Sequence, residues 1–394
     1  MVTATAVAKD IFWVGALNPD LRWFDVVMHT PHGTTYNAYL ILGEKIALVE
    51  QVHARFTDVL IDNIRQLIDP AKIDYLIVNH TEMDHTGALV KVLDLAPNAQ
   101  VVSTKVAATF LKKIVNREFR SIAVGDGDTL SLGNKTLQFI SVPYWHWPDT
   151  MFTYLVEDKT LFPCDGFAAH YCDERLFNDL VPDYTEDFKY YYDSIMRPFR
   201  PKIAEGVEKI KDLDINLIGT SHGPIVRTDP RKYIQLYTDW AKSVPAAGKK
   251  NIVIFYVSAY GNTKKMAEEI AATINDSNIA TAKLIDAKTA AVDDVRSDLE
   301  SANGIIFGSP TFTGDALKPV WDIISLLGTV SAKGKPVAAF GSYGWSGEAV
   351  SLLEERLKGM KMKVAIPGLK ANFVPNQTEL DKCREFGKSF MAKI

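Results

Sequence analysis

The stretch VNHTEMDHTGA, Val78 to Ala88, gathers two histidines, a glutamate and an aspartate between His80 and His85. It follows the apolar segment IDYLIVN, which has the composition of a buried β-strand. Polar side chains directly after such a strand lie on a loop and can converge on one side. Imidazole and carboxylate groups are common metal ligands in proteins. The stretch therefore predicts a metal site at a strand end, for either hydrolysis or electron transfer.

The pattern H-x-E-x-D-H of this stretch resembles the H-x-H-x-D-H motif of the metallo-β-lactamase fold. The resemblance implies three later ligands in the order His, Asp, His. The chain offers His146 in YWHWPDT, Asp165 in FPCDGF and His222 in GTSHGPI, each after a strand-like segment. The implied metal ligands are His80, Glu82, Asp84, His85, His146, Asp165 and His222. The departure from the motif is Glu82, which replaces the second histidine.

Glu82 changes the metal that the site favours. Zinc suits imidazole-rich sites, whereas mixed imidazole and carboxylate ligation favours iron or manganese. Three carboxylates against two Fe²⁺ leave one excess positive charge, and against two Fe³⁺ they leave three, which a hydroxide or oxide bridge would offset. Asp165 is the natural bridging carboxylate between metals roughly 3.5–4 Å apart. His85 stays open, because in some relatives the equivalent side chain turns away and water replaces it.

The other histidines carry weaker signals, because a lone histidine is usually a surface or satisfied core group. We interpret His29, His32 and His53 as surface residues or as residues outside the ligand set. His170, five residues past Asp165, stays open as a residue that lines the pocket.

A second site is indicated where the strand IVIFYV runs into SAYGNTKKMAEEI. Ser258, Gly261, Asn262 and Thr263 stand at the start of a predicted helix, where hydroxyls, backbone N–H groups and the helix dipole favour an anion. The lysine of a triphosphate-binding loop is missing from this pattern. Taken alone, the loop fits an ordinary capped turn equally well.

Two further loops strengthen the anion-site interpretation. GSPTFTGDALKP and GSYGWSGEAV follow later apolar strands, and both combine glycines with aromatic side chains. Loops at the carboxyl ends of parallel strands are where open α/β sheets bind ligands. The three loops resemble those of flavodoxin, which implies non-covalently bound FMN. The implied FMN-binding residues are Ser258, Tyr260, Gly261, Asn262, Thr263, Ser309, Pro310, Thr311, Phe312, Thr313, Gly314, Ser342, Tyr343, Gly344, Trp345 and Gly347.

The strand pattern predicts two α/β domains. Short β-branched strands alternate with amphipathic helices up to about Lys242, which indicates a layered α/β fold. SVPAAGKK, Ser243 to Lys250, is the best linker candidate. Beyond it, the unbroken apolar strands NIVIFYV, GIIFGSP and PVAAFGSYG predict a parallel sheet covered on both faces. We expect a metallo-β-lactamase-like αββα sandwich over residues 1–247 and a flavodoxin-like doubly wound parallel sheet over residues 248–394.

The combination of these two domains resembles the flavodiiron proteins, and the resemblance covers the whole chain. It extends to GTTYNAYL, HWPDTMFTY and FGSYGWSGE. It implies an oxidoreductase that passes electrons from FMN to a non-haem diiron site and reduces O2 to water, NO to N2O, or both. It also implies a head-to-tail homodimer or dimer of dimers. No C-x-x-C pair follows the second domain, so we expect a separate electron donor, such as rubredoxin, a reductase or reduced deazaflavin.

Two other functions compete with this interpretation. One is a metal-dependent hydrolase of the metallo-β-lactamase superfamily with a regulatory flavodoxin-like domain, and the other is an electron carrier or scaffold with a vestigial metal site. Glu82 disfavours the hydrolase, and the filled ligand positions disfavour the scaffold. The choice between O2 and NO stays open, because Asp25 stands where some relatives carry a histidine. Glu50 stands where many carry an aspartate, with no role that the sequence gives.

Composition narrows the environment of the protein. The chain has 394 residues, of which 47% are hydrophobic and 23% charged, with a net charge of −4. No basic cluster indicates a nucleic-acid partner, and no apolar run reaches the roughly 18 residues of a membrane span. The N-terminus lacks the pattern of a signal peptide, so we expect a cytoplasmic protein. Cys164, Cys172 and Cys383 are odd in number and are expected to be plain buried thiols.

Overall fold

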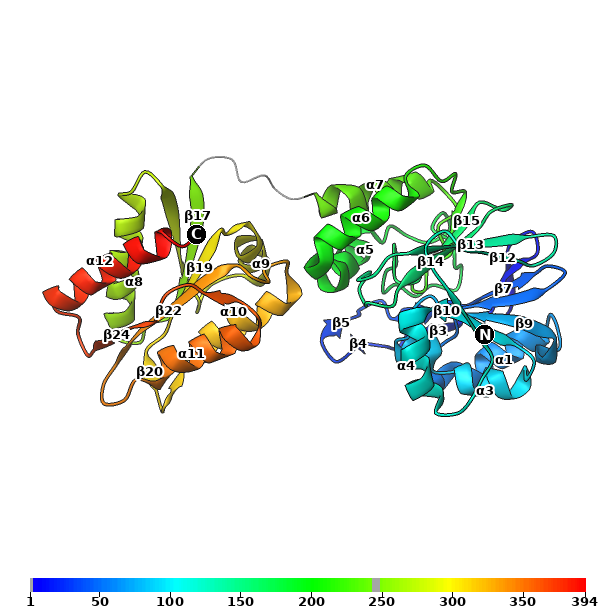
Figure 1. The fold of residues 1–394 in the computed structure, drawn as a ribbon, viewed down its shortest axis with the longest axis horizontal. Helices are drawn as coiled ribbons and strands as arrows, with labels where there is room; N and C mark the ends of the chain where they lie inside the picture. The colour runs from blue at the N-terminus through cyan, green and yellow to red at the C-terminus, as the bar shows by residue number, and fades with distance from the viewer. Residues whose placement is uncertain (1–2, 243–248) are drawn as a thin grey trace. The chain divides into compact units, whose positions relative to one another are not determined.

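The chain divides into two compact units, Met1–Lys242 and Ser243–Ile394 (Figure 1). The computed structural model describes residues 3–242 and 249–394. The predicted boundary between residues 247 and 248, and all but the last two residues of the predicted linker, lie outside the described residues. Within these residues, no helix is both long and apolar enough to cross a membrane.

The first unit contains two main sheets whose edges carry the later site. The seven strands of the larger sheet, in spatial order, are β1 (Thr5–Ala8), β2 (Ile11–Trp13), β7 (Tyr39–Leu42), β8 (Ile46–Val49), β9 (Ile73–Ile77), β10 (Gln100–Thr104) and β11 (Ser121–Val124). The smaller sheet has the order β12 (Thr129–Ser131), β13 (Thr136–Ser141), β14 (Met151–Leu155), β15 (Thr160–Phe162) and β16 (Leu217–Ile218). Two short hairpin-like pairs are β3 (Ala16–Asn18) with β6 (Thr34–Tyr36) and β4 (Trp23–Phe24) with β5 (Met28–His29). Strands β8 to β11 run parallel, as expected for strands linked by helices.

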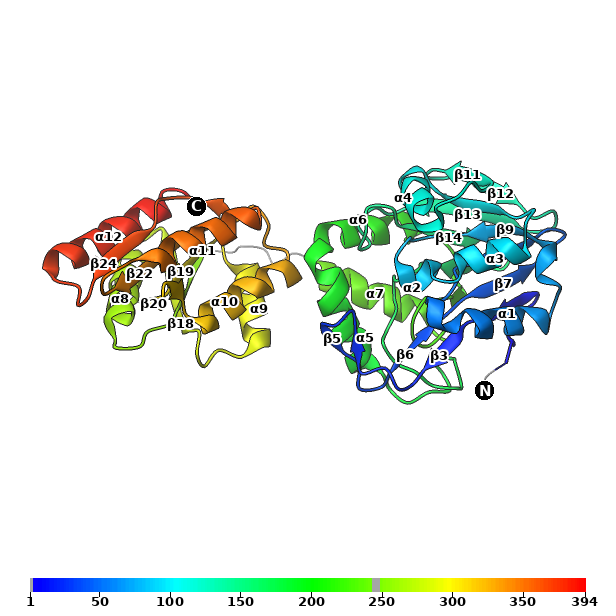
Figure 2. The same ribbon diagram turned by 90° about the horizontal axis from the view of Figure 1, so that it is seen from below.

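Three apolar cores show how the layers of this unit stack. One core lies between the two sheets, where Trp13 and Ile77 of the larger sheet meet Phe139 of the smaller one. A second core packs the larger sheet against helices α1 (Thr57–Arg65), α3 (Leu89–Leu95) and α4 (Lys105–Val115). The third packs the smaller sheet against α5 (Thr185–Tyr191), α6 (Arg200–Ile210) and α7 (Pro230–Ala241) (Figure 2). The predicted αββα sandwich is confirmed.

Shorter helical segments connect these layers. The four-residue helix α2 (Met83–Thr86) follows β9, and a π-helical turn, Tyr192–Met196, continues α5. Short 3₁₀ segments occur in this unit at Ala54–Phe56, Pro70–Lys72 and Arg197–Phe199, and in the second unit at Leu327–Thr329.

The second unit is built on one parallel sheet. Its strands, in spatial order, are β18 (Ala280–Asp286), β17 (Lys250–Tyr256), β19 (Gly304–Gly308), β22 (Pro336–Tyr343) and β23 (Lys363–Val364), and β24 (Leu369–Asn372) also pairs with β22. Helices α8 (Asn262–Asn275) and α12 (Gln377–Met391) cover one face, and α9 (Val292–Ser301), α10 (Lys318–Leu326) and α11 (Glu348–Gly359) cover the other (Figure 1). A short hairpin pairs β20 (Thr311–Phe312) with β21 (Asp315–Ala316). The predicted flavodoxin-like doubly wound sheet is confirmed.

Candidate functional site

The seven candidate metal ligands lie on loops that follow β9, β13, β15 and β16, and on α2. The end of β9 is held between the two sheets, because Val78 N donates to Val102 O at 2.9 Å and Met151 N donates to Asn79 O at 2.9 Å. His146 follows Trp145, whose buried indole Nε1 donates to Lys202 O at 2.9 Å. Backbone hydrogen bonds and a buried anchor therefore fix the loops that bring the candidate ligands together.

One set of candidate ligands consists of His80, Glu82, His146 and Asp165, whose ligand atoms lie within 4.8 Å of one another. Glu82 Oε2 lies 3.1 Å from His80 Nε2 and 3.4 Å from His146 Nε2. Asp165 Oδ2 lies 3.2 Å from His146 Nε2 and 3.7 Å from His80 Nε2. Two imidazole nitrogens and two carboxylates therefore face one point.

A second set forms on the other side of Asp165. Asp84, His85 and His222 have ligand atoms within 4.8 Å of one another. Asp84 Oδ2 lies 3.1 Å from His222 Nε2, and Asp84 Oδ1 lies 3.4 Å from His85 Nε2. Asp165 Oδ1 lies 3.2 Å from His85 Nε2 and 3.4 Å from His222 Nε2. The two oxygens of Asp165 thus face different sets, which is the arrangement of a carboxylate that bridges two metal ions.

The electrostatics of both sets fit two bound cations. Burial opposes the protonated form of His222, but hydrogen bonding to Asp165 and Asp84 outweighs it and raises the pKa of His222 to about 9. Burial likewise opposes charge on His146, and Asp165 and Glu82 raise its pKa to about 9. His85 Nε2 and Asp84 Oδ1 are buried without a hydrogen-bond partner among the described residues. The pocket therefore concentrates negative charge around inward-facing nitrogens, and its donor set suits two iron ions.

The outer ring nitrogens of three candidate histidine ligands have fixed partners. His222 Nδ1 donates to Thr35 O at 2.6 Å, and His80 Nδ1 lies 3.4 Å from Asp149 Oδ1. His85 Nδ1 lies 3.5 Å from Glu50 Oε2. Such contacts set the ring orientation and leave Nε2 free to bind metal. Asp149 and Thr35 lie within the segments HWPDTMFTY and GTTYNAYL, but no role at the metal site was predicted for either residue.

Aromatic side chains form the wall around the second set. The ring of Phe24 lies 4.2 Å from His170 and 5.4 Å from His222, measured between centroids. His170 Nδ1 forms a hydrogen bond with Thr34 Oγ1 at 2.9 Å. His170 belongs to neither ligand set and is part of the wall beside His222. Burial, followed by the charge of Asp165, raises the pKa of Tyr191 well above its usual range. Tyr191 therefore keeps its phenolic proton beside Asp165.

The residues left outside the ligand set are placed as follows. His29, His32 and His53 are exposed, and His32 Nδ1 lies 2.9 Å from Asp187 Oδ1. Asp25 lies at the turn between β4 and β5, near the metal-site carboxylates. Burial, followed by the charges of Glu82 and Asp84, raises the pKa of Asp25 to about 6.

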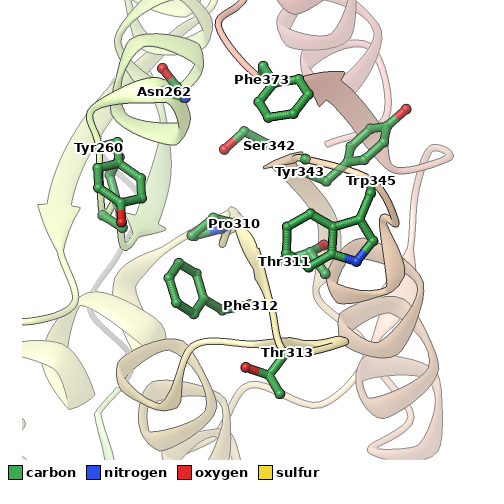
Figure 3. A pocket seen from close by; sticks show the side chains of 13 residues that line it. Tyr260, Asn262, Pro310, Thr311, Phe312, Thr313, Ser342, Tyr343, Trp345 and Phe373 are labelled. Atoms are coloured by element: carbon green, nitrogen blue, oxygen red, sulfur yellow. The ribbon is translucent and has the colours of Figure 1, made fainter.

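A separate cavity of about 470 Å³ opens in the second unit, at the carboxyl ends of its parallel strands (Figure 3). Most of the predicted FMN-binding residues line this cavity. They are Ser258, Tyr260, Asn262, Pro310, Thr311, Phe312, Thr313, Ser342, Tyr343, Gly344 and Trp345. Ala259 and Phe373, which were not predicted, also line it. Figure 3 shows aromatic side chains around the opening, and those of Tyr260, Phe312, Trp345 and Phe373 come from four separate segments of the chain. The size and the aromatic walls suit a flat ring system.

The other predicted FMN-binding residues lie next to this cavity, outside its lining. They are Gly261, Thr263, Ser309, Gly314 and Gly347. Thr263 Oγ1 lies 2.8 Å from Ser342 Oγ, and Ser309 Oγ accepts a hydrogen bond from Leu317 N at 2.9 Å. These hydroxyls therefore brace the loops that form the cavity.

One end of the cavity suits a phosphate group. Asn262 lines it and is the first residue of α8, so the positive end of the helix dipole lies there. Gly261 precedes the helix with φ +85°, a conformation that favours glycine. Ser258 Oγ is buried without a hydrogen-bond partner among the described residues. A helix N-terminus, a buried hydroxyl and an aromatic-lined cavity together fit FMN.

Comparison with known families agrees with this division of the chain. The model of the "ODP family beta lactamase" matches residues 34–223, and the model of flavodoxin matches residues 254–387. The chain is 42% identical over 402 residues to "Flavo-diiron protein FprA2" of Clostridium acetobutylicum, covering 99% of this chain and 100% of the relative. It is 37% identical over 404 residues to "Nitric oxide reductase" of Moorella thermoacetica, covering all of both chains.

Among solved structures, the chain resembles rubredoxin oxygen:oxidoreductase from Desulfovibrio gigas. That similarity has a TM-score of 0.72 and 29% sequence identity, and covers 99% of this chain and 98% of the other.

Fold and sites together define a flavoprotein that also holds a pair of non-haem irons. The chain belongs to the flavodiiron proteins, as its full-length identity to relatives shows. The predicted family, fold and cofactor types are confirmed. The relatives support the predicted oxidoreductase over the predicted hydrolase alternative.

Proposed function

We propose that this chain passes electrons from FMN to a diiron site and reduces O2 to water, NO to N2O, or both. The observation that carries the proposal is Asp165, whose two oxygens face two separate sets of histidine and carboxylate ligands. The flavin-sized cavity in the second unit supports a redox reaction, because metal-dependent hydrolysis needs no flavin. Glu82 replaces the second histidine of the H-x-H-x-D-H motif, and a carboxylate in place of an imidazole supports iron over zinc.

The residues of the chain hold and shield the reacting centre. When bound, FMN supplies electrons singly or in pairs and the irons bind and reduce the gas. Glu82 and Asp84 would each ligate one metal ion, and Asp165, whose two oxygens face both sets, would ligate both. The ring of Trp147, 4.8 Å from that of His80, and the ring of Tyr36, 5.7 Å from that of His222, limit access of bulk water.

Protons must also reach the gas, since forming water from O2 consumes four protons with four electrons. Tyr191 lies beside Asp165, and burial together with the charge of Asp165 keeps its phenol protonated. A phenol with a raised pKa gives up its proton less readily than a free tyrosine, so we assign Tyr191 the role of a neutral hydrogen-bond donor at the site and not that of the proton source.

The test of the proposed function is reoxidation of the reduced protein. The protein is loaded with iron and FMN, reduced without air, and exposed separately to O2 and to NO. We expect rapid return of the oxidised flavin absorbance with at least one gas, and formation of water or N2O in the matching amount. A flavin that reoxidises equally slowly with and without bound iron would contradict the proposal.

We further propose that a separate protein, such as rubredoxin or a reductase, donates the electrons in the cytoplasm. The opening of the flavin cavity supports a docking donor, because Tyr260 at this opening is 83% exposed. The three cysteines are all free, which agrees with a reducing compartment.

A head-to-tail homodimer, or a dimer of such dimers, is our proposal for the assembly. Apolar side chains are exposed beside both sites: Val26 and Val27 next to the metal site, and Trp345 and Phe373 at the flavin cavity. Exposed apolar groups gathered in patches mark contact surfaces. Pairing one patch with the other in a second copy would bring FMN of one subunit to the diiron site of its partner.

Mixing two inactive variants tests this assembly. One variant lacks iron but binds FMN, and the other lacks FMN but binds iron. In a head-to-tail heterodimer, the intact FMN of the first faces the intact iron site of the second. An equal mixture, unfolded and refolded together, should regain about a quarter of the wild-type rate, since half the dimers are mixed and each has one working pair. A refolded mixture that is no more active than the two variants measured separately would contradict the proposed arrangement.

A further inference from the structure

Glu50 is a buried acid directly behind the proposed metal site. It follows β8, is 2% exposed, and has φ +58°. A non-glycine residue at positive φ costs free energy and is retained where the surrounding structure requires it. The backbone supports this position, because Glu50 N donates to Ile77 O at 3.0 Å and Gln51 N donates to His85 O at 3.2 Å. The backbone next to Glu50 is therefore tied to the backbone of a candidate ligand.

The two carboxylate oxygens of Glu50 face two different donors. Oε1 accepts a hydrogen bond from Asn79 N at 3.1 Å. Oε2 lies 3.5 Å from His85 Nδ1 and has no hydrogen-bond partner among the described residues. The thiol of Cys164 also lies near this nitrogen, with Sγ 3.8 Å away. A charged carboxylate is a much stronger acceptor than a thiol, so it favours a proton on Nδ1.

The opposite nitrogen of the same ring then points into the site. His85 Nε2 lies 3.2 Å from Asp165 Oδ1 and 3.4 Å from Asp84 Oδ1. A proton on Nδ1 leaves the lone pair of Nε2 available to a metal ion. Rotation of the ring away from the site would break the 3.5 Å contact between Nδ1 and Oε2, and the buried Oε2 would then face no donor among the described residues, which costs free energy.

His80 shows the same arrangement in the other ligand set. Asp149 is also buried, and its Oδ2 accepts hydrogen bonds from Thr81 N at 2.9 Å and from Thr81 Oγ1 at 2.7 Å. Its other oxygen, Oδ1, lies 3.4 Å from His80 Nδ1. Each ligand set therefore has one histidine backed by a buried carboxylate whose second oxygen is tied to the backbone of the loop after β9.

We propose that Glu50 is a positioning residue that holds His85 as a ligand of the iron facing Asp84 and His222. The inference rests on the proposed diiron site. It adds that the side chain of Glu50 keeps the imidazole of His85 in place beside that of His222. Glutamate suits the position because both of its neighbours, Asn79 N–H and His85 Nδ1–H, are donors. A glutamine has one acceptor oxygen and an NH2 group, so it satisfies only one of these donors.

The test measures iron retention by the full-length protein. Wild type, Glu50→Gln and the matched variant Asp149→Asn are loaded with Fe²⁺ without air, and iron release to a coloured ferrous chelator is followed over time. We expect two irons per wild-type chain. Each variant should release one iron about 10- to 100-fold faster and keep the other at the wild-type rate. A circular dichroism spectrum and a thermal midpoint that match wild type check that the first unit is folded, because the flavin cavity belongs to the other unit.

A second comparison separates positioning from general damage. Glu50→Gln should accelerate iron release in the wild-type background but cause no further change in His85→Ala, because the effect acts through that ring. Since Glu50 is buried, Glu50→Asp gives a milder change that keeps the charge. It is one methylene too short to reach both donors, so we expect an intermediate release rate.

The outcomes distinguish this inference from the proposed function. Wild-type protein that binds fewer than two irons would overturn the diiron function and this inference with it. Two irons in wild type, with Glu50→Gln releasing both at the wild-type rate, would overturn the role of Glu50 alone. Equal acceleration of iron release in Glu50→Gln and Glu50→Asp would do the same. An effect of Glu50→Gln that persists fully in His85→Ala would also overturn it.

Discussion

Replacing Asp165 with asparagine should release both irons and lower the rate of gas reduction at least about 100-fold. The side chain is 2% exposed, and each of its oxygens faces two histidine nitrogens within 3.7 Å. Asparagine has nearly the same volume but lacks the charge and presents an NH2 group to one of the two sets. That group cannot bind a cation, so one set loses a ligand and the other loses the charge. Elemental analysis gives the iron content per chain.

The control for this variant is Asp214→Asn in the same unit. Asp214 is an exposed residue that pairs with Lys159 on the surface, so its loss of charge leaves the ligand sets intact. Both variants should keep wild-type flavin absorbance, because the flavin cavity belongs to the other unit. Asp165→Asn protein that retains two irons would show that this carboxylate does not bridge them.

The sequence was sufficient for the fold because burial leaves a direct signal in each half. Ile252, Val253 and Ile254 are all fully buried in β17, and a strand covered on both faces must be apolar at every position. The metal-ligand motif was equally readable, because its polar residues interrupt an apolar strand at the point where the chain leaves the sheet. Both signals are local, so one sequence suffices to find them.

Contacts between distant segments were not predictable in the same way. Glu50 meets His85 from a different strand end, and Asp149 reaches His80 from the loop that also carries His146. Neither spacing has a periodicity, since the contact exists only once the sheets have packed. A buried acid in an apolar segment such as ALVEQV was the available signal, because burying a charge without a partner is costly.

Phe373 was missed although a general rule could have found it. It follows β24, which pairs in parallel with β22, so it lies at the same edge of the sheet as the three predicted flavin loops. Its segment, LKANFVPN, has no glycine-rich loop, and for that reason it did not resemble a cofactor site. Strand order, which the sequence alone did not give, brings Phe373 to the cavity.

Replacing Gly261 with valine should empty the flavin site while leaving both irons in place. Gly261 has φ +85°, and a β-branched side chain in this conformation costs about 1–3 kcal/mol of strain. A Cβ at this position meets no atom within 4 Å among the described residues, so the change does not displace the core and acts on the conformation of the loop before α8. Because the change lies at the start of α8, we expect FMN binding to weaken at least about 10-fold. Flavin absorbance after gel filtration measures the loss.

Gly334→Val separates loss of the binding site from loss of stability. Gly334 lies in the same unit with φ +82°, and a Cβ there also meets no described atom within 4 Å. Its backbone strain should match that of Gly261→Val, yet it precedes β22 and does not border the flavin cavity. We therefore expect Gly334→Val to lower the thermal midpoint by a similar amount and to retain FMN. Equal loss of FMN in both variants would mean that destabilisation of the sheet, rather than the loop before α8, controls flavin binding.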